Sequence, residues 1–187
     1  HIYIYLGTIY KEKGNFIKAI ECFQKCINLD PQFGAGYNNL GGVYFTQKNY
    51  DKAIPCFRKS ADLSPDDAYT LHNLGNAYIK NDQIELAFKT FIKVAELDPQ
   101  YATAFNSIGN CYLKSHNLQK AFEFYKKTLT LDPQHDYSRL NIGMIQLMHK
   151  DFKNGWLNYE WREKTNKNRH ALVMPPKNKL WRGEPLK

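Results

Sequence analysis

Apolar and polar positions alternate along the chain in blocks that have the period of an α-helix. One block begins with an apolar or small face at the spacing i, i+3, i+4, i+7, made by Tyr37, Leu40, Gly41 and Tyr44. The polar stretch TQKN separates it from a second apolar face, made by Tyr50, Ala53, Ile54 and Phe57. The sequence DLSPD follows, and its proline cannot continue a helix. This block therefore predicts a helix–turn–helix hairpin.

The same block recurs along the chain at a period of 34 residues. We call the residues at one position of successive repeats a column. A glycine column, preceded each time by Leu or Ile, consists of Gly7, Gly41, Gly75, Gly109 and Gly143. Four further columns are Tyr10, Tyr44, Tyr78, Tyr112 and Gln146; Ala19, Ala53, Ala87, Ala121 and Gly155; Phe23, Phe57, Phe91, Tyr125 and Tyr159; and Pro31, Pro65, Pro99, Pro133 and Lys167. Four repeats match in register and a fifth is degenerate.

The small columns indicate how the helices pack. Glycine inside a helix costs about 1 kcal/mol against alanine, so a glycine column implies that a neighbouring element comes close there. The alanine column lets the two helices cross tightly, and the aromatic column fills the space beyond. A single hairpin cannot bury its apolar faces, whereas a stack of hairpins can. The sequence therefore predicts an all-α solenoid with these segments: 1–33, 34–67, 68–101, 102–135, a degenerate capping repeat at 136–166 and a basic linker at 167–187.

These columns resemble the tetratricopeptide repeat (TPR) family over residues 1 to about 166. The resemblance implies a right-handed superhelical solenoid that acts as a non-catalytic scaffold for a protein or peptide partner. Tyr125 replaces the usual Phe, and the fifth repeat has lost its Tyr, Ala and Pro, as suits a terminal capping repeat. The period and the Ala and Pro columns favour TPR over the pentatricopeptide type, which reads RNA. His1 falls at the second position of a repeat, so we expect the first repeat to be truncated.

In TPR arrays the first helix of each repeat lines a concave groove, and here those helices carry asparagines. Asparagine is a poor helix former, but its amide can pair with the backbone of an extended peptide. Lys80 and Lys114, one turn beyond two of these asparagines, could meet a carboxylate. The alternative is that the amides bond one another or water across adjacent helices. The predicted groove residues are Asn38, Asn39, Asn73, Asn76, Lys80, Asn106, Asn110, Lys114 and Asn141.

Two TPR subfamilies suggest different ligands for this groove. Asn76 and Asn110 match fragments of the carboxylate clamp of co-chaperone TPR scaffolds. The asparagine ladder of O-linked N-acetylglucosamine transferases is closer, because Asn39, Asn73 and Asn141 share one column, with Ser107 as a departure.

The C-terminal segment carries a second resemblance. GWLNYEWR and PPKNKLWRGEPL resemble the junction of bacterial proteins that join a TPR array to a glycosyltransferase-like domain. The array would then be the non-catalytic arm of such a parent. Alternatively, its aromatic residues fold back as a cap on the last repeat: Trp156, Tyr159, Trp161 and Trp181.

Composition and charge narrow the classes of function. The six histidines are scattered, no phosphate-binding loop occurs, and no metal-ligand spacing is found, so we expect no enzyme activity in this chain and no cofactor. The net charge is +8, but residues 1–148 hold 16 basic and 14 acidic side chains, or +2, while residues 149–187 hold 10 and 4, or +6. The nearly neutral array argues against a nucleic-acid track, leaving the basic tail as an alternative site for nucleic acid or an acidic surface.

Cysteine use and hydropathy bear on location. Four unpaired cysteines fit a reducing cytoplasm, although a signal peptide is not excluded because the true N-terminus could be missing. No apolar stretch is long enough for a membrane span. End-to-end self-association of arrays stays open.

Overall fold

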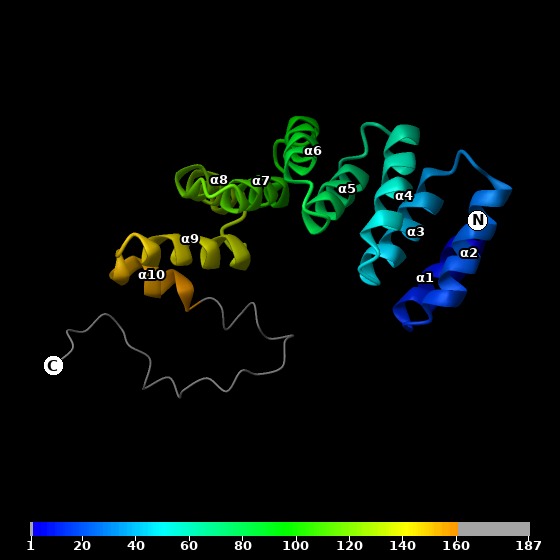
Figure 1. Cartoon of the computed structure of the whole chain (residues 1–187), viewed down its shortest axis with the longest axis horizontal. Coiled ribbons are helices and arrows are strands. Elements are labelled where there is room, and N and C mark those ends of the chain that lie inside the picture. Colours follow the sequence, from blue (N-terminus) through cyan, green and yellow to red (C-terminus); the bar gives the residue numbers. More distant parts are fainter. Residues whose placement is uncertain (1, 161–187) are drawn as a thin grey trace. The chain divides into compact units, whose positions relative to one another are not determined.

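The predicted all-α fold is confirmed by the computed structural model, which describes residues 2–160 (Figure 1). Within these residues the chain forms ten helices and no strand. They are α1 (Ile2–Glu12), α2 (Phe16–Leu29), α3 (Gly34–Thr46), α4 (Tyr50–Leu63), α5 (Ala68–Lys80), α6 (Ile84–Leu97), α7 (Ala102–Lys114), α8 (Leu118–Leu131), α9 (Asp136–Met148) and α10 (Phe152–Tyr159). Odd-numbered helices are the first helices of the repeats and even-numbered helices are the second.

The glycine and aromatic columns meet inside each hairpin. A Cβ atom built on Gly75 would lie 2.5 Å from the Phe91 ring, and one on Gly109 would lie 2.6 Å from the Tyr125 ring. Both rings are completely buried. The glycine is therefore required because the aromatic ring of the second helix occupies the space of its side chain.

The turn inside each hairpin has a fixed backbone conformation. The residue two positions before the second helix adopts a left-handed conformation each time, with φ between 58° and 72°. Only the first turn uses glycine for this, and the column reads Gly14, Lys48, Asp82, His116 and Lys150. The residue that follows usually caps the second helix: Asn15, Asn49, Asn117 and Asp151 each accept a hydrogen bond from the backbone N–H three residues on.

Three of these turns are also tied to the first helix by a lysine. The Lys52 backbone donates to the Asn49 cap, while the Lys52 ammonium lies 5.7 Å from the centre of the Tyr44 ring. The same arrangement recurs at Lys18 over Tyr10 and at Lys120 over Tyr112. The third repeat differs, because Gln83 makes no side-chain cap and Leu86 stands in the lysine column.

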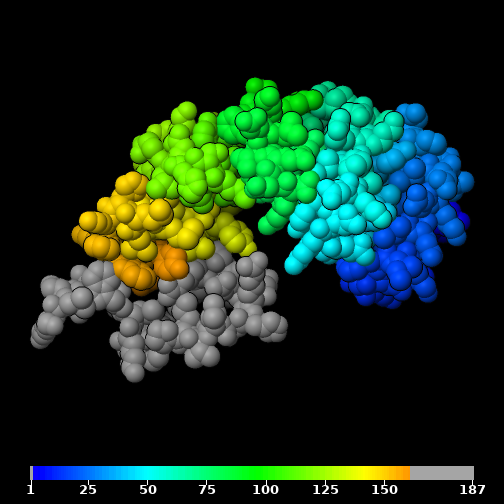
Figure 2. All heavy atoms as spheres, viewed as in Figure 1, coloured from blue at the N-terminus to red at the C-terminus, as the bar shows by residue number. Residues whose placement is uncertain are grey.

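The chain divides into two compact units, His1–Pro99 and Gln100–Lys187. We call them the N-terminal and C-terminal units, and α1–α6 belong to the first and α7–α10 to the second. Side chains fill the space between successive helices of each unit (Figure 2). One core cluster of the N-terminal unit centres on Ala19, Phe23, Leu40 and Val43, and one of the C-terminal unit centres on Ala121, Tyr125, Ile142 and Ile145.

Free cysteines contribute small apolar side chains to this packing. Cys22, Cys26 and Cys111 are buried and Cys56 is half-buried. Burial raises the pKa of the Cys56 thiol to about 11, so it stays protonated at neutral pH.

Candidate peptide-binding site

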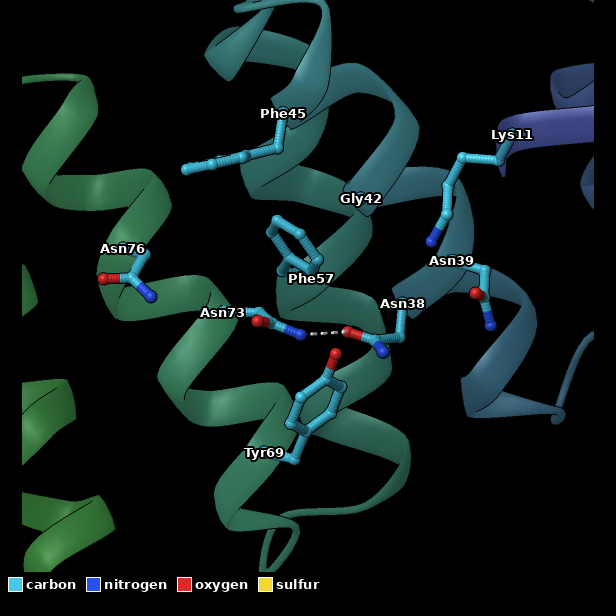
Figure 3. A pocket seen from close by; sticks show the side chains of 9 residues that line it. All are labelled: Lys11, Asn38, Asn39, Gly42, Phe45, Phe57, Tyr69, Asn73 and Asn76. Carbon is cyan, nitrogen blue, oxygen red and sulfur yellow. Dashed lines mark hydrogen bonds between the residues drawn. The ribbon is translucent and has the colours of Figure 1, made fainter. Parts of the chain in front are cut away.

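Four of the predicted asparagines line one pocket of the N-terminal unit. The pocket has a volume of about 130 Å³ and is built from the first helices of three successive repeats, together with Phe57 of α4. Lys11 comes from the end of α1, and Asn73 and Asn76 come from α5 (Figure 3). Its lining is Lys11, Asn38, Asn39, Gly42, Phe45, Phe57, Tyr69, Asn73 and Asn76.

A hydrogen bond between two asparagines crosses the middle of the pocket. Asn73 Nδ2 on α5 donates to Asn38 Oδ1 on α3 at 3.1 Å (Figure 3). This bond uses one donor of Asn73 and one lone pair of Asn38, so Asn73 keeps its amide oxygen and Asn38 its amide nitrogen. The bonded pair therefore presents both an acceptor and a donor.

Two other amides are oriented by bonds to their own helices. Asn39 Nδ2 donates to the Ala35 carbonyl at 2.9 Å, and Asn76 Nδ2 lies 3.3 Å from His72 Nδ1. His72 is 8% exposed, and burial lowers its pKa to about 4, so the ring is neutral at pH 7 and its Nδ1 can accept the Asn76 proton. In both cases the bond engages the amide nitrogen and does not use the amide oxygen.

Five lining residues were missed by the asparagine pattern, and one of them, Phe57, is a buried core residue of α4. Lys11 adds a positive charge, Tyr69 a 62% exposed ring with a hydroxyl, and Phe45 an apolar wall. Gly42 leaves the middle of the pocket open, since a Cβ atom there would meet nothing within 4 Å. The repeat columns could have indicated these residues, because Gly42 shares a column with the predicted residue Asn76, and Lys11 shares one with Phe45.

In the C-terminal unit, the three predicted groove asparagines bond within the protein. Asn106 is 8% exposed and accepts from the Ser138 hydroxyl at 2.9 Å. Asn110 Oδ1 accepts from the Tyr125 hydroxyl at 2.8 Å and from Asn141 Nδ2 at 3.3 Å. The bonds from Ser138 and Asn141 join α9 to α7, and the bond from Tyr125 joins α8 to α7. The Asn141–Asn110 bond matches the alternative in which the amides pair across adjacent helices.

The remaining predicted residues have simple positions. Lys80 and Lys114 are exposed in the last turns of α5 and α7, and neither lines the pocket. Trp156 and Tyr159 are half-buried on α10, with ring centres 5.8 Å apart in an edge-on arrangement. Trp161 and Trp181 lie outside the described residues.

Residues 2–160 lack two other classes of feature. No group of three or more His, Cys, Asp or Glu side chains in that range could hold a metal ion. None of the helices there combines the length and the apolar character that a membrane crossing needs.

Family models for the tetratricopeptide repeat match residues 2–33 and 35–67, and a second such model matches residues 66–134. The chain belongs to the tetratricopeptide repeat family. TPR arrays are scaffolds for protein–protein interaction, and the pocket lies on the first helices of three TPR hairpins. No curated protein matches the chain.

Solved TPR structures are similar over most of the chain. A MamA crystal structure is 27% identical, with a TM-score of 0.76, and the match covers 92% of this chain and 97% of MamA. PilF of Pseudomonas aeruginosa is 21% identical, with a TM-score of 0.79, over 87% of this chain and 74% of PilF. YrrB, described as a TPR protein with an unusual peptide-binding site, is 19% identical, with a TM-score of 0.68, over 89% of this chain and 86% of YrrB.

Proposed function

We propose that the N-terminal unit binds an extended peptide of a protein partner in the pocket between α1, α3 and α5. The single observation that carries this proposal is the set of four asparagines that face one pocket from consecutive first helices. An extended peptide offers N–H and C=O groups in alternation, and the bonded pair of Asn38 and Asn73 still has donors and acceptors to meet them.

The size of the pocket favours a peptide over a small-molecule cofactor. Ligand pockets for drug-sized molecules measure about 300–1,000 Å³, whereas this one measures about 130 Å³. Phe45 gives an apolar contact for one side chain, and Lys11 suits a nearby carboxylate. We infer that the pocket is an anchoring subsite of a longer interface and that its peptides carry an acidic group beside an apolar one.

Peptides selected from a random display library against the whole chain would test the proposal. Asn39→Ala and Asn76→Ala should each weaken binding of a selected, fluorescently labelled peptide about two- to tenfold, the cost of one hydrogen bond. Gln24→Ala, an exposed amide on α2, is the matched control and should change nothing. Circular dichroism establishes that each variant is folded. Unchanged affinity in both pocket variants would refute the proposal.

Other ligands for the array remain predictions with separate tests. The carboxylate clamp predicts that Lys80→Ala and Lys114→Ala weaken a peptide only when its C-terminal carboxylate is free. Binding of nucleic acid or an acidic surface by the basic tail predicts affinity that falls steeply with salt. A role as the arm of a bacterial glycosyltransferase predicts a sugar-nucleotide fold encoded after Lys187. The prediction of a cytoplasmic location rests only on the cysteine content.

End-to-end self-association has one specific observation in its favour. Leu6 and Ile9 on α1 are 38% and 46% exposed, whereas Leu40 and Val43 in the same columns are 5% and 0% exposed. The α1 face therefore has the apolar pattern that, on α3, is buried in the core of the unit. If a second copy covers it, Ile9→Glu should abolish concentration-dependent association in sedimentation experiments, and Ile17→Glu on α2 should not. Monomeric wild-type protein at high concentration would exclude this role.

A further inference from the structure

The two core clusters are equivalent, since their members are related by a shift of 102 residues, or three repeats. Ala19, Phe23, Leu40 and Val43 correspond in order to Ala121, Tyr125, Ile142 and Ile145. The side chains packed around the two clusters differ at several positions, two of which matter here. In the N-terminal unit Tyr44 and Cys56 pack against the cluster, but their counterparts are the polar residues Gln146 and Asn158.

A pocket opens in the C-terminal unit where these apolar side chains are missing. It has a volume of about 410 Å³, and Gln146 and Asn158 line it. Its apolar walls are Phe122, Leu129 and Ile142, the counterparts of Ile20, Ile27 and Leu40 in the complete cluster. The C-terminal unit therefore keeps apolar residues at the positions of these walls, but it has Gln146 where the N-terminal unit has Tyr44.

The two amides close the polar side of this pocket. Asn158 Nδ2 donates to Gln146 Oε1 at 2.8 Å, and Gln146 Nε2 lies 3.5 Å from Asp151 Oδ2. The same columns in the fourth repeat hold Tyr112 and Phe124, whose ring centres are 5.4 Å apart. The contact between two rings in the fourth repeat is thus replaced by a contact between two amides in the fifth. Because amides are smaller than aromatic rings, they cover less of the apolar wall of the pocket.

We propose that this pocket binds an aromatic side chain of a protein partner, in the place that Tyr44 takes in its own repeat. The repeat register identifies the occupant, because the retained walls match those beside Tyr44. Lys126 favours an aromatic over an aliphatic group: it also lines the pocket, and its ammonium lies 5.6 Å from the centre of the Phe122 ring. This site belongs to the C-terminal unit, so it does not depend on the peptide site of the N-terminal unit.

The test uses p-cresol, the side-chain analogue of tyrosine, with the full chain labelled on its Ile and Leu methyl groups. We expect saturable chemical-shift changes at Leu129 and Ile142. Gln146→Tyr supplies the missing ring from within and should abolish them, whereas Gln119→Tyr, an exposed glutamine on α8, should not. Phe122→Ala, which removes a wall instead of filling the space, should weaken binding about two- to tenfold.

Two short peptides then test whether the occupant can come from a protein. Gly-Gly-Tyr-Gly-Gly should displace p-cresol, and Gly-Gly-Leu-Gly-Gly should do so at least several times more weakly. Methyl shifts that do not saturate, or that persist in both Gln146→Tyr and Phe122→Ala, would overturn the proposed pocket. Failure of the tyrosine peptide to compete, or equal competition by the leucine peptide, would overturn the proposed occupant.

Discussion

Two adjacent glycines of α3 should respond in opposite ways to the same substitution. A Cβ atom on Gly41 would lie 2.9 Å from two carbons of the Phe57 ring and 3.2 Å from Cys56 Cβ. A Cβ atom on Gly42 would meet nothing within 4 Å. Phe57 is 2% exposed, so its ring has little room to move away.

The magnitudes follow from two competing effects. Replacing glycine by alanine inside a helix favours the folded state by about 0.8–1 kcal/mol at either position. Overpacking a close-packed core costs about 1–3 kcal/mol, and this cost applies only to Gly41→Ala. Gly42→Ala should therefore stabilise the protein by about 1 kcal/mol, and Gly41→Ala should be neutral or destabilising by up to about 2 kcal/mol.

Urea unfolding followed by circular dichroism at 222 nm measures both variants. The helix propensity of the two substitutions is the same, so the difference between the variants isolates the packing of Phe57 against α3. We expect a difference of about 1–3 kcal/mol. Amide hydrogen exchange in α3 and α4 locates the effect in this hairpin, because repeat arrays need not unfold in one step. Equal stability of the two variants would refute the account of the glycine column.

Three further predictions concern other parts of the fold. His116→Gly should stabilise the protein by up to about 1 kcal/mol in thermal unfolding, because φ at His116 is 58°, whereas Gly14→Ala should destabilise it by a similar amount. Tyr125→Phe should lower the free energy of unfolding by about 1 kcal/mol, because the hydrogen bond to Asn110 is lost. Burial raises the pKa of the Tyr125 hydroxyl, so the wild type should also lose stability as the pH rises above 10, and the variant should lose less. Burial lowers the pKa of His72 from 6.5 to about 4, so the stability of the protein should fall by roughly 3 kcal/mol as the pH drops from 6.5 to 4. In His72→Asn the urea midpoint should depend less on pH over that range, and an unchanged pH profile would contradict the assignment.

The repeat made the architecture predictable from the sequence, while the site was only partly predictable. Gly75 and Phe91 are in fixed columns, so their contact follows from the period alone. The asparagines are harder because the same residue type serves two purposes. Asn39 lines the pocket, whereas Asn106 is buried against Ser138, and the sequence holds no sign that the serine hydroxyl would take the amide oxygen.

Residues from different repeats also meet in ways that a column does not reveal. Lys11 lines the pocket with Asn76, which lies 65 positions further along the chain. Which side chains share a pocket depends on how far each first helix is offset from the next. That offset is set by packing, as with Asn73, which bonds to Asn38 across 35 positions. The pocket lined by Gln146 could have been predicted from a column, because Gln146 replaces the tyrosine that the other four repeats hold there.

The third repeat lacks the lysine and the side-chain cap that secure the first, second and fourth hairpin turns. Gln83 makes no cap, and Leu86 is 46% exposed where the first, second and fourth repeats hold a cation over a tyrosine ring. Backbone bonds such as the one from the Ala87 N–H to the Gln83 carbonyl close the start of α6 without the side-chain cap and the lysine. Transient opening should therefore be most frequent there. A protease of broad specificity, applied briefly to the folded chain, should cut near residues 82–86 before it cuts the turns at residues 14–16, 48–50 or 116–118.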